Sequence, residues 1–567
     1  MGQPTGTAVP SDRSGVRSDE RGEDMPGSAR PISPGSLSMS AFPRQYSRKL
    51  ISQIWSSTGS VFGPKLPHNT NRTEEMGHNR LKADRNKLNT LRALAAPLES
   101  SSATRVARLQ QAGEHAERFL ESLPQRDVYG VAGPREEAMA AFAIPQYPEP
   151  FDEALQVVEQ YVDGIGHNLG SSRFFAYIPS GGLHDSAIAD YLAAVSNRYA
   201  GVGAAAPGAT RMEHTMLRWL ADVVGYPDSA EGDLTSGGSI AALSAVVTAR
   251  EASSLMSAEL PSAVVYLTAH THHTFRKALH VAGLGECVMR EIPLDASMRM
   301  DCDRLQESIR EDREAGLRPW LIAASAGTTD TGSIDSLDRI ADIAADADVW
   351  MHVDAAYGGA FALCEEGRQR LKGIERSDSM ILDPHKGFFL PCGIGVVLIR
   401  DGQKLFDAYH SRGTYMQDVA GDAERSPCDY SAELTRPSRA LRFWLPFKIH
   451  GSQAFAAALE EKLVLAQYFY DRCGNIEGIE LGPVPDLSVV TFRFCPASMD
   501  ADIATRALLD EIHRDGRIFL ASTTIAGQFT IRLAILTYRT HVEDVDLALT
   551  VIRECAAQIE TGGRVQR

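Results

Sequence analysis

The chain has 567 residues, of which 44% are hydrophobic and 23% are charged, a composition typical of a soluble globular protein with a full core. Its length is sufficient for about two to four domains of ordinary size. The 73 acidic residues outnumber the 57 basic ones and give a formal net charge of −16, which argues against nucleic acid or an anionic membrane as the main partner. An anionic cofactor is not excluded, because a local group of backbone amides can bind an anion on an acidic protein.

The eight cysteines are spread between Cys287 and Cys555 without a CxxC motif or a close pair. This spacing fits neither a zinc site nor a disulfide scaffold, and it indicates a reducing compartment. No apolar run approaches the roughly 18 residues that a membrane span requires, and the N-terminus lacks the apolar core of a secretory signal. We therefore expect a cytoplasmic protein that does not associate with a membrane.

The first part of the chain differs in composition from the rest. Residues 1–84 are rich in Gly, Ser, Pro and charged residues without sustained apolar periodicity, so we expect them to be mostly disordered. Within residues 85–180, apolar residues recur at three- and four-residue spacing. That pattern predicts a helical N-terminal segment that packs on something larger, such as a partner subunit.

Residues 181–445 alternate short β-branched apolar runs with amphipathic helical patterns. The clearest runs are 262–269, 319–327, 348–356, 379–385 and 393–400. This alternation predicts a large α/β domain on a mostly parallel sheet that helices cover on both faces. In such sheets, ligands bind beyond the C-terminal ends of the strands. Residues 446–567 predict a small C-terminal α/β domain that ends in a helix.

Two of these runs end beside residues that indicate a particular cofactor. Asp354 lies at the end of one run, and Lys386 directly follows another. A lysine amine forms a Schiff base with the aldehyde of pyridoxal 5′-phosphate, and a carboxylate can keep the pyridine nitrogen of that cofactor protonated. A single lysine is more often a solvated surface charge, so the hypothesis rests on the pair.

Gly237, Gly238 and Ser239 stand at the head of an apolar, helix-like stretch. Glycines let the backbone approach a ligand closely, and the amides of a first helical turn bind phosphate with help from the helix dipole. Such a segment alone is more often only a loop with a helix cap. Beside Asp354 and Lys386, we interpret it as the cradle for the cofactor phosphate.

Three further positions could contact the cofactor ring. Among the close histidines after residues 262–269 we choose His272 to stack flat on the ring, with His273 as the alternative; no metal-site pattern of carboxylates or cysteines surrounds them. The Thr328 hydroxyl could reach the cofactor or substrate, or only cap a turn. Ala356 follows the aspartate at a two-residue spacing, which returns to the same face of a strand, and its small side chain would let the ring lie close to the sheet.

Residues 409–435 form a long polar stretch without an apolar pattern. Stretches of this length inside compact domains are usually lids or disordered loops. Tyr430 and Tyr415 are the two candidates for an acid that protonates a carbanion. For either tyrosine alone, a packing or surface role is the more common outcome.

Several longer segments carry a recognisable pattern, namely THHTFRKA, SAGTT, HVDAAYGGA, DPHKGFFLP and DYSAELTRPSRALRFW. Together they resemble the group II pyridoxal-phosphate-dependent amino acid decarboxylases, a family that includes aromatic-L-amino-acid, tyrosine and glutamate decarboxylases. The similarity covers roughly residues 150–560. It implies the fold type I of pyridoxal-phosphate enzymes (aspartate-aminotransferase-like), with a homodimer whose active sites lie at the subunit interface.

The resemblance also implies roles for single residues. Lys386 would be the Schiff-base lysine, Asp354 the partner of the pyridine nitrogen and His272 the stacked imidazole. His385, Gly238 and Ser239 would lie near the cofactor phosphate.

The long polar stretch is similar to the mobile catalytic loop of the family, whose tyrosine returns a proton to the substrate carbon. Tyr430 is the nearest match to that tyrosine. Some relatives with phenylalanine there are aldehyde synthases, so a tyrosine favours simple decarboxylation.

Two features depart from the aromatic-specific members. Gly201 and Gly203 stand where many of those members carry bulky aromatic residues, which suggests a roomier or reshaped substrate pocket. Arg173 precedes an aromatic pair and could meet an acidic group of a substrate, although a solvent-facing position is the more common one.

We therefore expect a carboxy-lyase that converts an L-amino acid to the corresponding amine and carbon dioxide. The alternatives are another fold type I enzyme (an aldehyde synthase, an aminotransferase or a carbon–sulfur lyase) and a protein that binds pyridoxal phosphate without catalysis.

Overall fold

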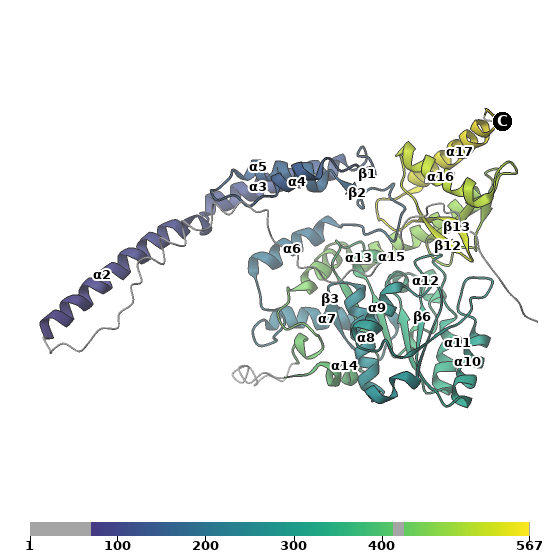
Figure 1. Ribbon diagram of the computed structural model, residues 1–567, viewed down its shortest axis with the longest axis horizontal. Coiled ribbons are helices and arrows are strands. Elements are labelled where there is room, and N and C mark those ends of the chain that lie inside the picture. The colour runs from purple at the N-terminus through teal and green to yellow at the C-terminus, as the bar shows by residue number, and fades with distance from the viewer. Residues whose placement is uncertain (1–69, 412–424, 566–567) are drawn as a thin grey trace, which may run out of the picture. The chain divides into compact units, whose positions relative to one another are not determined.

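The computed structural model describes residues 70–411 and 425–565, and the chain divides into two compact units, Met1–Ser100 and Ser101–Arg567. The described part of the first unit consists of α2 (Thr70–Ala95) and a 3₁₀ turn (Figure 1). A proline in that turn accounts for the end of the α-helix, because proline lacks the N–H donor and disfavours helical geometry in the residue before it.

Helix α2 corrects one expectation about the N-terminal region. It begins at Thr70, inside the segment 1–84 that was expected to be disordered. Charged residues dominate this stretch, yet no proline interrupts it, so local helix propensity is sufficient to continue the helix. Residues 1–69 lie outside the described part of the chain.

The second unit opens with short helices joined by a small β-ribbon. In chain order these elements are α3 (Ser102–Ser122), β1 (Tyr129–Gly130), α4 (Arg135–Ala141), α5 (Phe151–Val158), a π-turn (Glu159–Asp163) and β2 (Gly166–His167). Ser101 caps α3 by accepting a hydrogen bond from the backbone N–H of Thr104.

A seven-stranded sheet forms the centre of this unit, with the strand order β3-β9-β8-β7-β6-β4-β5. The strands are β3 (Glu231–Thr235), β4 (Ala263–Leu267), β5 (Val288–Glu291), β6 (Arg318–Ser325), β7 (Trp350–Asp354), β8 (Ser379–Leu382) and β9 (Gly395–Ile399). Only β9 runs antiparallel to its neighbours, which confirms the predicted mostly parallel sheet. The five apolar runs became β4, β6, β7, β8 and β9; β3 and β5 were not predicted because both are short and carry charged residues.

Helices cover both faces of this sheet because successive strand residues point to opposite sides. Val264 and Tyr266 of β4 join one core cluster with helices α7, α10 and α11, whereas Val265 joins the other with α8, α9 and α14. The helices are α6 (His184–Ser196), α7 (Pro207–Val224), α8 (Gly238–Ala252), α9 (His273–Val281), α10 (Cys302–Glu314), α11 (Leu337–Asp346), α12 (Glu365–Arg370), α13 (Pro384–Gly387) and α14 (Gly402–Tyr409).

The C-terminal part is a four-stranded antiparallel sheet, in the order β10-β11-β13-β12, which shares one hydrophobic core with three helices. Its elements are α15 (Arg439–Cys473), β10 (Ile479–Leu481), β11 (Val489–Phe494), α16 (Ala501–Asp515), β12 (Ala521–Ile525), β13 (Gln528–Ala534) and α17 (Val542–Val565). The domain boundary expected at residues 445/446 falls inside α15, which continues from one core into the next and kinks at Gly451.

None of the helices in the described ranges has the length and apolar character needed to cross a lipid bilayer.

Candidate active site

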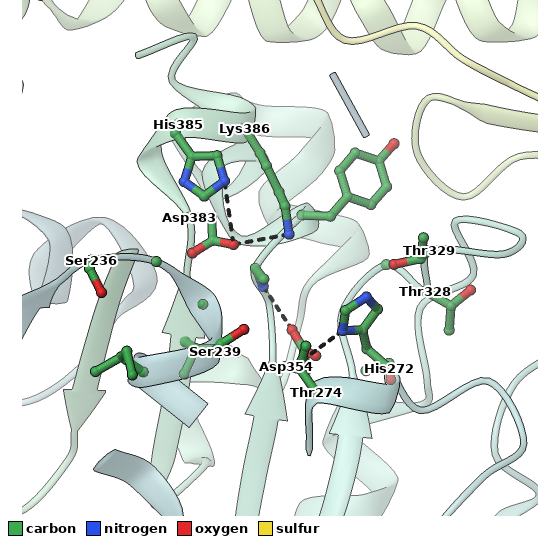
Figure 2. Close-up of a pocket in the computed structure, with 18 of the residues that line it drawn as sticks. Ser236, Ser239, His272, Thr274, Thr328, Thr329, Asp354, Asp383, His385 and Lys386 are labelled. Atoms are coloured by element: carbon green, nitrogen blue, oxygen red, sulfur yellow. Dashed lines mark hydrogen bonds and ion pairs between the residues drawn. The ribbon is translucent and has the colours of Figure 1, made fainter. Parts of the chain in front are cut away.

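A cavity of about 330 Å³ opens at the C-terminal ends of the parallel strands (Figure 2). The segments that follow β3, β4, β6, β7 and β8 border it, as expected for the ligand site of such a sheet. It is lined by all the residues proposed from the sequence except Tyr430, namely Gly237, Gly238, Ser239, His272, Thr328, Asp354, Ala356, His385 and Lys386. Residues that are far apart in the chain therefore meet in one place.

Lys386 lies on the short helix α13, and its Nζ is 3.0 Å from Oδ2 of Asp383. The aspartate is three residues earlier, a spacing that places both side chains on one side of a helical turn. Asp383 also lines the cavity and is only 3% exposed. It had not been assigned a role from the sequence, although its position three residues before the lysine was the available signal.

Asp354 ends β7 in the middle of the sheet, and its Oδ1 accepts a hydrogen bond of 3.1 Å from the backbone N–H of Ala356. This bond helps to fix the orientation of a carboxylate that faces the cavity. Ala356 itself is buried and lines the cavity, and its small side chain leaves room beside the carboxylate.

His272 stands directly before α9, where its Nδ1 lies 2.6 Å from the Thr274 hydroxyl oxygen. Burial lowers the pKa of the His272 imidazole, and the neighbouring Asp354 carboxylate opposes that shift only in part. The ring is therefore mainly neutral near pH 7. The alternative, His273, is exposed and does not line the cavity, which favours His272 for a stacking role.

The head of α8 has the geometry of an anion cradle. Gly237 adopts φ = 148°, a conformation that favours glycine. Gly238 begins the helix, and a β-carbon there would lie only 2.7 Å from Oδ2 of Asp383. The first-turn N–H groups of a helix lack partners within the helix, so they are available to bind a phosphate at this point.

His385 and Thr328 complete the predicted set. The Nδ1–H of His385 donates to the carbonyl oxygen of Ile394 at 2.6 Å, while its Nε2 lies 3.9 Å from Oδ2 of Asp383. Thr328 is buried, and its hydroxyl accepts from the Thr331 N–H at 3.3 Å. Thr328 therefore caps a turn, and it also lines the cavity, so its contact with a cofactor or substrate stays a prediction.

The structure does not support the assignment of Tyr430 as the lid acid. The side chain is only 2% exposed, packs against Phe406 and does not line the cavity. Its hydroxyl accepts a hydrogen bond of 3.3 Å from Arg425, and burial raises its pKa. The reason is that the residues around Tyr430 fold back onto the core beside α14. The other candidate, Tyr415, lies outside the described residues.

The two glycines of the preceding loop have a different role from the one expected. A β-carbon at Gly201 would collide with the carbonyl oxygen of Leu434. The Gly201 carbonyl accepts from the Cys428 N–H at 3.0 Å, and the Gly203 N–H donates to Ser426 Oγ at 2.9 Å. Gly201 therefore allows two backbone segments to pack closely, and the Gly203 backbone adds a hydrogen bond between the same segments.

Arg173 neither meets an acidic group nor faces solvent freely. Its guanidinium donates to the carbonyl oxygens of Pro124, Arg126 and Arg517. The side chain thus joins the N-terminal helices to the C-terminal domain, and it has a structural role.

Arg532 on β13 is a buried cation that sequence reasoning missed. Within the described ranges, its Nε and Nη2 atoms have no hydrogen-bond partner. Burial lowers the pKa of this guanidinium to about 10, while the charges of Asp330 and Tyr357 act in the opposite direction. Tyr357 lines the cavity. An arginine inside a strand of the C-terminal domain gives no sequence signal of this proximity.

The donor set fits pyridoxal 5′-phosphate. The glycine cradle at the head of α8 suits a phosphate, Lys386 suits an aldehyde, and the Asp354 carboxylate suits a protonated ring nitrogen. The His272 imidazole could contact one face of a planar ring, and the small side chain of Ala356 leaves room for the other face.

Comparisons with known proteins agree with this geometry. The family model described as "Pyridoxal-dependent decarboxylase conserved domain" matches residues 134–495. Aromatic-L-amino-acid decarboxylase of Bacillus atrophaeus is 34% identical over 425 residues, which span 74% of this chain and 88% of that protein. Tryptophan decarboxylase 1 of Oryza sativa subsp. japonica is 30% identical over 419 residues, which span 69% of this chain and 81% of that protein.

Among solved structures, Oryza sativa TDC with PLP and tryptamine superposes with a TM-score of 0.76 at 26% identity, covering 81% of this chain and 99% of that one. This likeness confirms the predicted fold type I, and the cofactor in that structure agrees with the pyridoxal phosphate expected from the sequence. The chain belongs to the pyridoxal-dependent decarboxylase family, and it is a pyridoxal-phosphate-dependent carboxy-lyase that acts on an amino acid.

Proposed function

We propose that this protein decarboxylates an aromatic L-amino acid and releases the aromatic amine with carbon dioxide. The observation that supports this proposal most directly is that Lys386, Asp354 and His272 line one cavity beside a glycine cradle. The relatives named for aromatic amino acid and tryptophan decarboxylation support the substrate class. Of the two glycines that suggested an altered pocket, Gly201 is accounted for by its packing against the Leu434 backbone.

When bound, pyridoxal phosphate supplies an electron sink for the electron pair that remains as the carboxylate leaves. The residues of this chain would hold and tune that group. Lys386 provides the amine that bonds to the aldehyde, and Asp354 provides the negative charge that keeps a proton on the ring nitrogen. The N–H groups after Gly237 would bind the phosphate, and the neutral imidazole of His272 would cover one ring face.

The buried guanidinium of Arg532 interacts electrostatically with Tyr357, which lines the cavity, and with Asp330. We propose that it orients an anionic group of the substrate, since its unpartnered N–H groups can bind a carboxylate.

We further propose a cytoplasmic homodimer. All eight cysteines are free thiols in the structure, in agreement with a reducing compartment. The helices at the start of the second unit expose large apolar side chains, including Val106, Leu109 and Met139. Such side chains together support an interface with a second copy.

The test is a screen of the reconstituted enzyme against tryptophan, tyrosine, phenylalanine, histidine, glutamate and cysteine sulfinate. Carbon dioxide and amine are quantified together. We expect the aromatic substrates to give both products in equal amounts, and Lys386→Ala to give neither. Turnover of only the acidic substrates would contradict the aromatic assignment, and wild-type turnover by Lys386→Ala would contradict the assigned lysine.

One alternative product requires a separate assay. From the sequence, a tyrosine in the long polar stretch favours simple decarboxylation over aldehyde formation. The tyrosine chosen for that role, Tyr430, lies outside the cavity. Ammonia and aldehyde are therefore measured in the same reactions. Equal amounts of amine and carbon dioxide, without aldehyde, identify simple decarboxylation.

A further inference from the structure

Asp383 is the residue of this site to which neither the sequence nor the proposed function gives a role. Its carboxylate is 3% exposed, and its Oδ2 lies 3.0 Å from Nζ of Lys386. Its Oδ1 has no hydrogen-bond partner within the part of the chain that the structure describes. Figure 2 shows the side chains of Lys386 and His385 directed toward this one carboxylate.

The surrounding elements leave a space that this carboxylate fills. A β-carbon at Gly238 would lie 2.7 Å from Oδ2, and one at Gly395 would lie 2.8 Å from Oδ1. The backbone N–H of Asp383 donates to the carbonyl oxygen of Ala356 at 3.1 Å, and the Lys386 N–H donates to the Asp383 carbonyl at 2.8 Å. The carboxylate is therefore held against the lysine by packing on two sides and by its own backbone.

A purely structural role does not account for this placement. Asp383 occupies the cap position of α13, yet its side chain accepts no capping hydrogen bond from that helix. A buried carboxylate is unfavourable unless a cation or several donors compensate it. The cation in direct contact is Lys386, the group that must react.

The chemistry of the lysine supplies a reason for a base at this point. An ammonium group has no free electron pair, so Lys386 must lose a proton before its nitrogen can attack an aldehyde carbon. A carboxylate at 3.0 Å can take that proton without any movement of the chain. The burial of Asp383, which is 3% exposed, also reduces the cost of turning an ion pair into a neutral acid and a neutral amine.

We propose that Asp383 is a catalytic residue that takes the proton from the Lys386 ammonium when the lysine bonds to the cofactor and returns it when the lysine is released. This inference rests on the proposed function, because it assumes pyridoxal phosphate in the cavity. The ammonium gives one proton to the carboxylate, and the free amine attacks the aldehyde carbon. The aldehyde oxygen then leaves as water with the two remaining amine protons, so no oxidant or reductant is needed.

The titratable groups that face the Asp383 carboxylate are few. Lys386 and His385 approach it from α13. The other elements packed against it, α8 and β9, contribute Gly238 and Gly395, which do not titrate. Lys386 also interacts electrostatically with His272, which lies near Asp354, so the contribution of Asp383 is obtained by comparing the pH profiles of the wild type and Asp383→Asn.

The test separates binding of the cofactor from its reaction with the lysine. Apoprotein is mixed rapidly with pyridoxal phosphate, and bond formation is followed by its visible absorbance. Non-covalent affinity is measured with pyridoxine 5′-phosphate, which lacks the aldehyde. We expect Asp383→Asn to bind pyridoxine phosphate like the wild type but to bond to pyridoxal phosphate about 100-fold more slowly near neutral pH. Its rate should rise more steeply with pH, because solution bases replace the missing carboxylate.

Two further variants complete the experiment. Asp378→Asn removes a partly buried carboxylate just before β8 that contacts the Met351 N–H, and it should bond at the wild-type rate. Asp383→Glu keeps a carboxylate and should recover part of the rate lost in Asp383→Asn, which also covers the case in which the asparagine variant does not fold.

The experiment distinguishes an error in the role of Asp383 from an error in the proposed function. If wild-type protein bonds to no pyridoxal phosphate, the cofactor assignment itself is wrong. If the wild type reacts and Asp383→Asn reacts at the same rate with the same pH profile, the role of Asp383 is overturned. An equal loss of pyridoxine phosphate affinity and of bonding rate would also overturn it, because the aspartate would then only shape the cradle.

Discussion

Arg436 donates a hydrogen bond of 2.6 Å to the carbonyl oxygen of Leu234, near the end of the strand that leads into the phosphate cradle. The same guanidinium pairs with Asp233 at 2.5 Å and with Glu213 at 2.8 Å, and all three side chains are almost fully buried. One cation therefore ties the segment after the long polar stretch to β3 and α7.

Replacing this cation should be costly. Arg436→Ala leaves two buried carboxylates without their partner, and we predict a loss of about 3–5 kcal/mol in the free energy of unfolding, measured by urea denaturation. The control is Arg310→Ala, whose pair with Glu314 is exposed on one helix and should contribute at most about 0.5 kcal/mol. Equal effects of the two substitutions would show that the buried network does not stabilise the fold.

Glu213 should make stability depend on pH. Burial raises the pKa of Glu213 to about 7, and Arg436 opposes this only in part. The folded protein thus keeps a proton that the unfolded chain releases near its ordinary pKa of 4.5. The stabilising contribution of the protonated form is complete below pH 4.5 and is lost as the pH rises through about 7.

We therefore predict that Glu213→Gln, which resembles the protonated carboxyl, flattens the fall in unfolding free energy between about pH 5 and pH 8. Denaturation curves across that range provide the measurement. The control Glu314→Gln changes an exposed carboxylate, and its unfolding free energy should depend on pH as steeply as that of the wild type. If the unfolding free energy falls equally steeply with pH in the wild type and in Glu213→Gln, another group is responsible for the pH dependence of stability.

Tyr430→Phe tests the correction to the lid assignment. Because the hydroxyl is buried outside the cavity and contacts Arg425, its removal should change kcat/KM by no more than about twofold. The lost hydrogen bond should cost about 0.5–1.5 kcal/mol of stability. Steady-state kinetics and thermal denaturation measure the two effects. A fall in kcat of about 100-fold or more would restore the tyrosine as an acid.

Gly201→Ala should destabilise the protein, because the added β-carbon would collide with the Leu434 carbonyl. We predict a loss of about 1–3 kcal/mol, the usual cost of overpacking. Gly208→Ala is a matched control near the start of α7, where a β-carbon meets nothing within 4 Å; it should gain up to about 1 kcal/mol from helix propensity. A substrate range broadened or narrowed by Gly201→Ala at unchanged stability would instead favour a pocket role.

The reacting part of the site was predictable because its chemistry is local to the chain. Lys386, Asp354 and His272 each follow an apolar run, and parallel strands that end at one edge of a sheet bring such residues together. The cradle at Gly237 was recognisable for a similar reason, since it combines glycines with the start of a helix.

Other features depended on contacts that no local pattern records. Tyr430 was misplaced because its segment folds onto the core beside α14, which a polar sequence does not reveal. Arg532 belongs to the C-terminal domain and nears the cavity only through the packing of that domain. Gly201 suggests a roomier pocket in the sequence, although its lack of a side chain serves packing against the Leu434 backbone.

The close approach of Gly238 to the Asp383 carboxylate has a consequence for redesign. The two positions form one unit, because a side chain fits at 238 only if residue 383 becomes smaller at the same time. At Gly395 a smaller residue 383 would not make room for a side chain, because the backbone of Gly237 occupies the same space. Libraries that aim at new substrates should therefore leave this floor of the site untouched and vary the opposite walls, where single changes can be combined more independently.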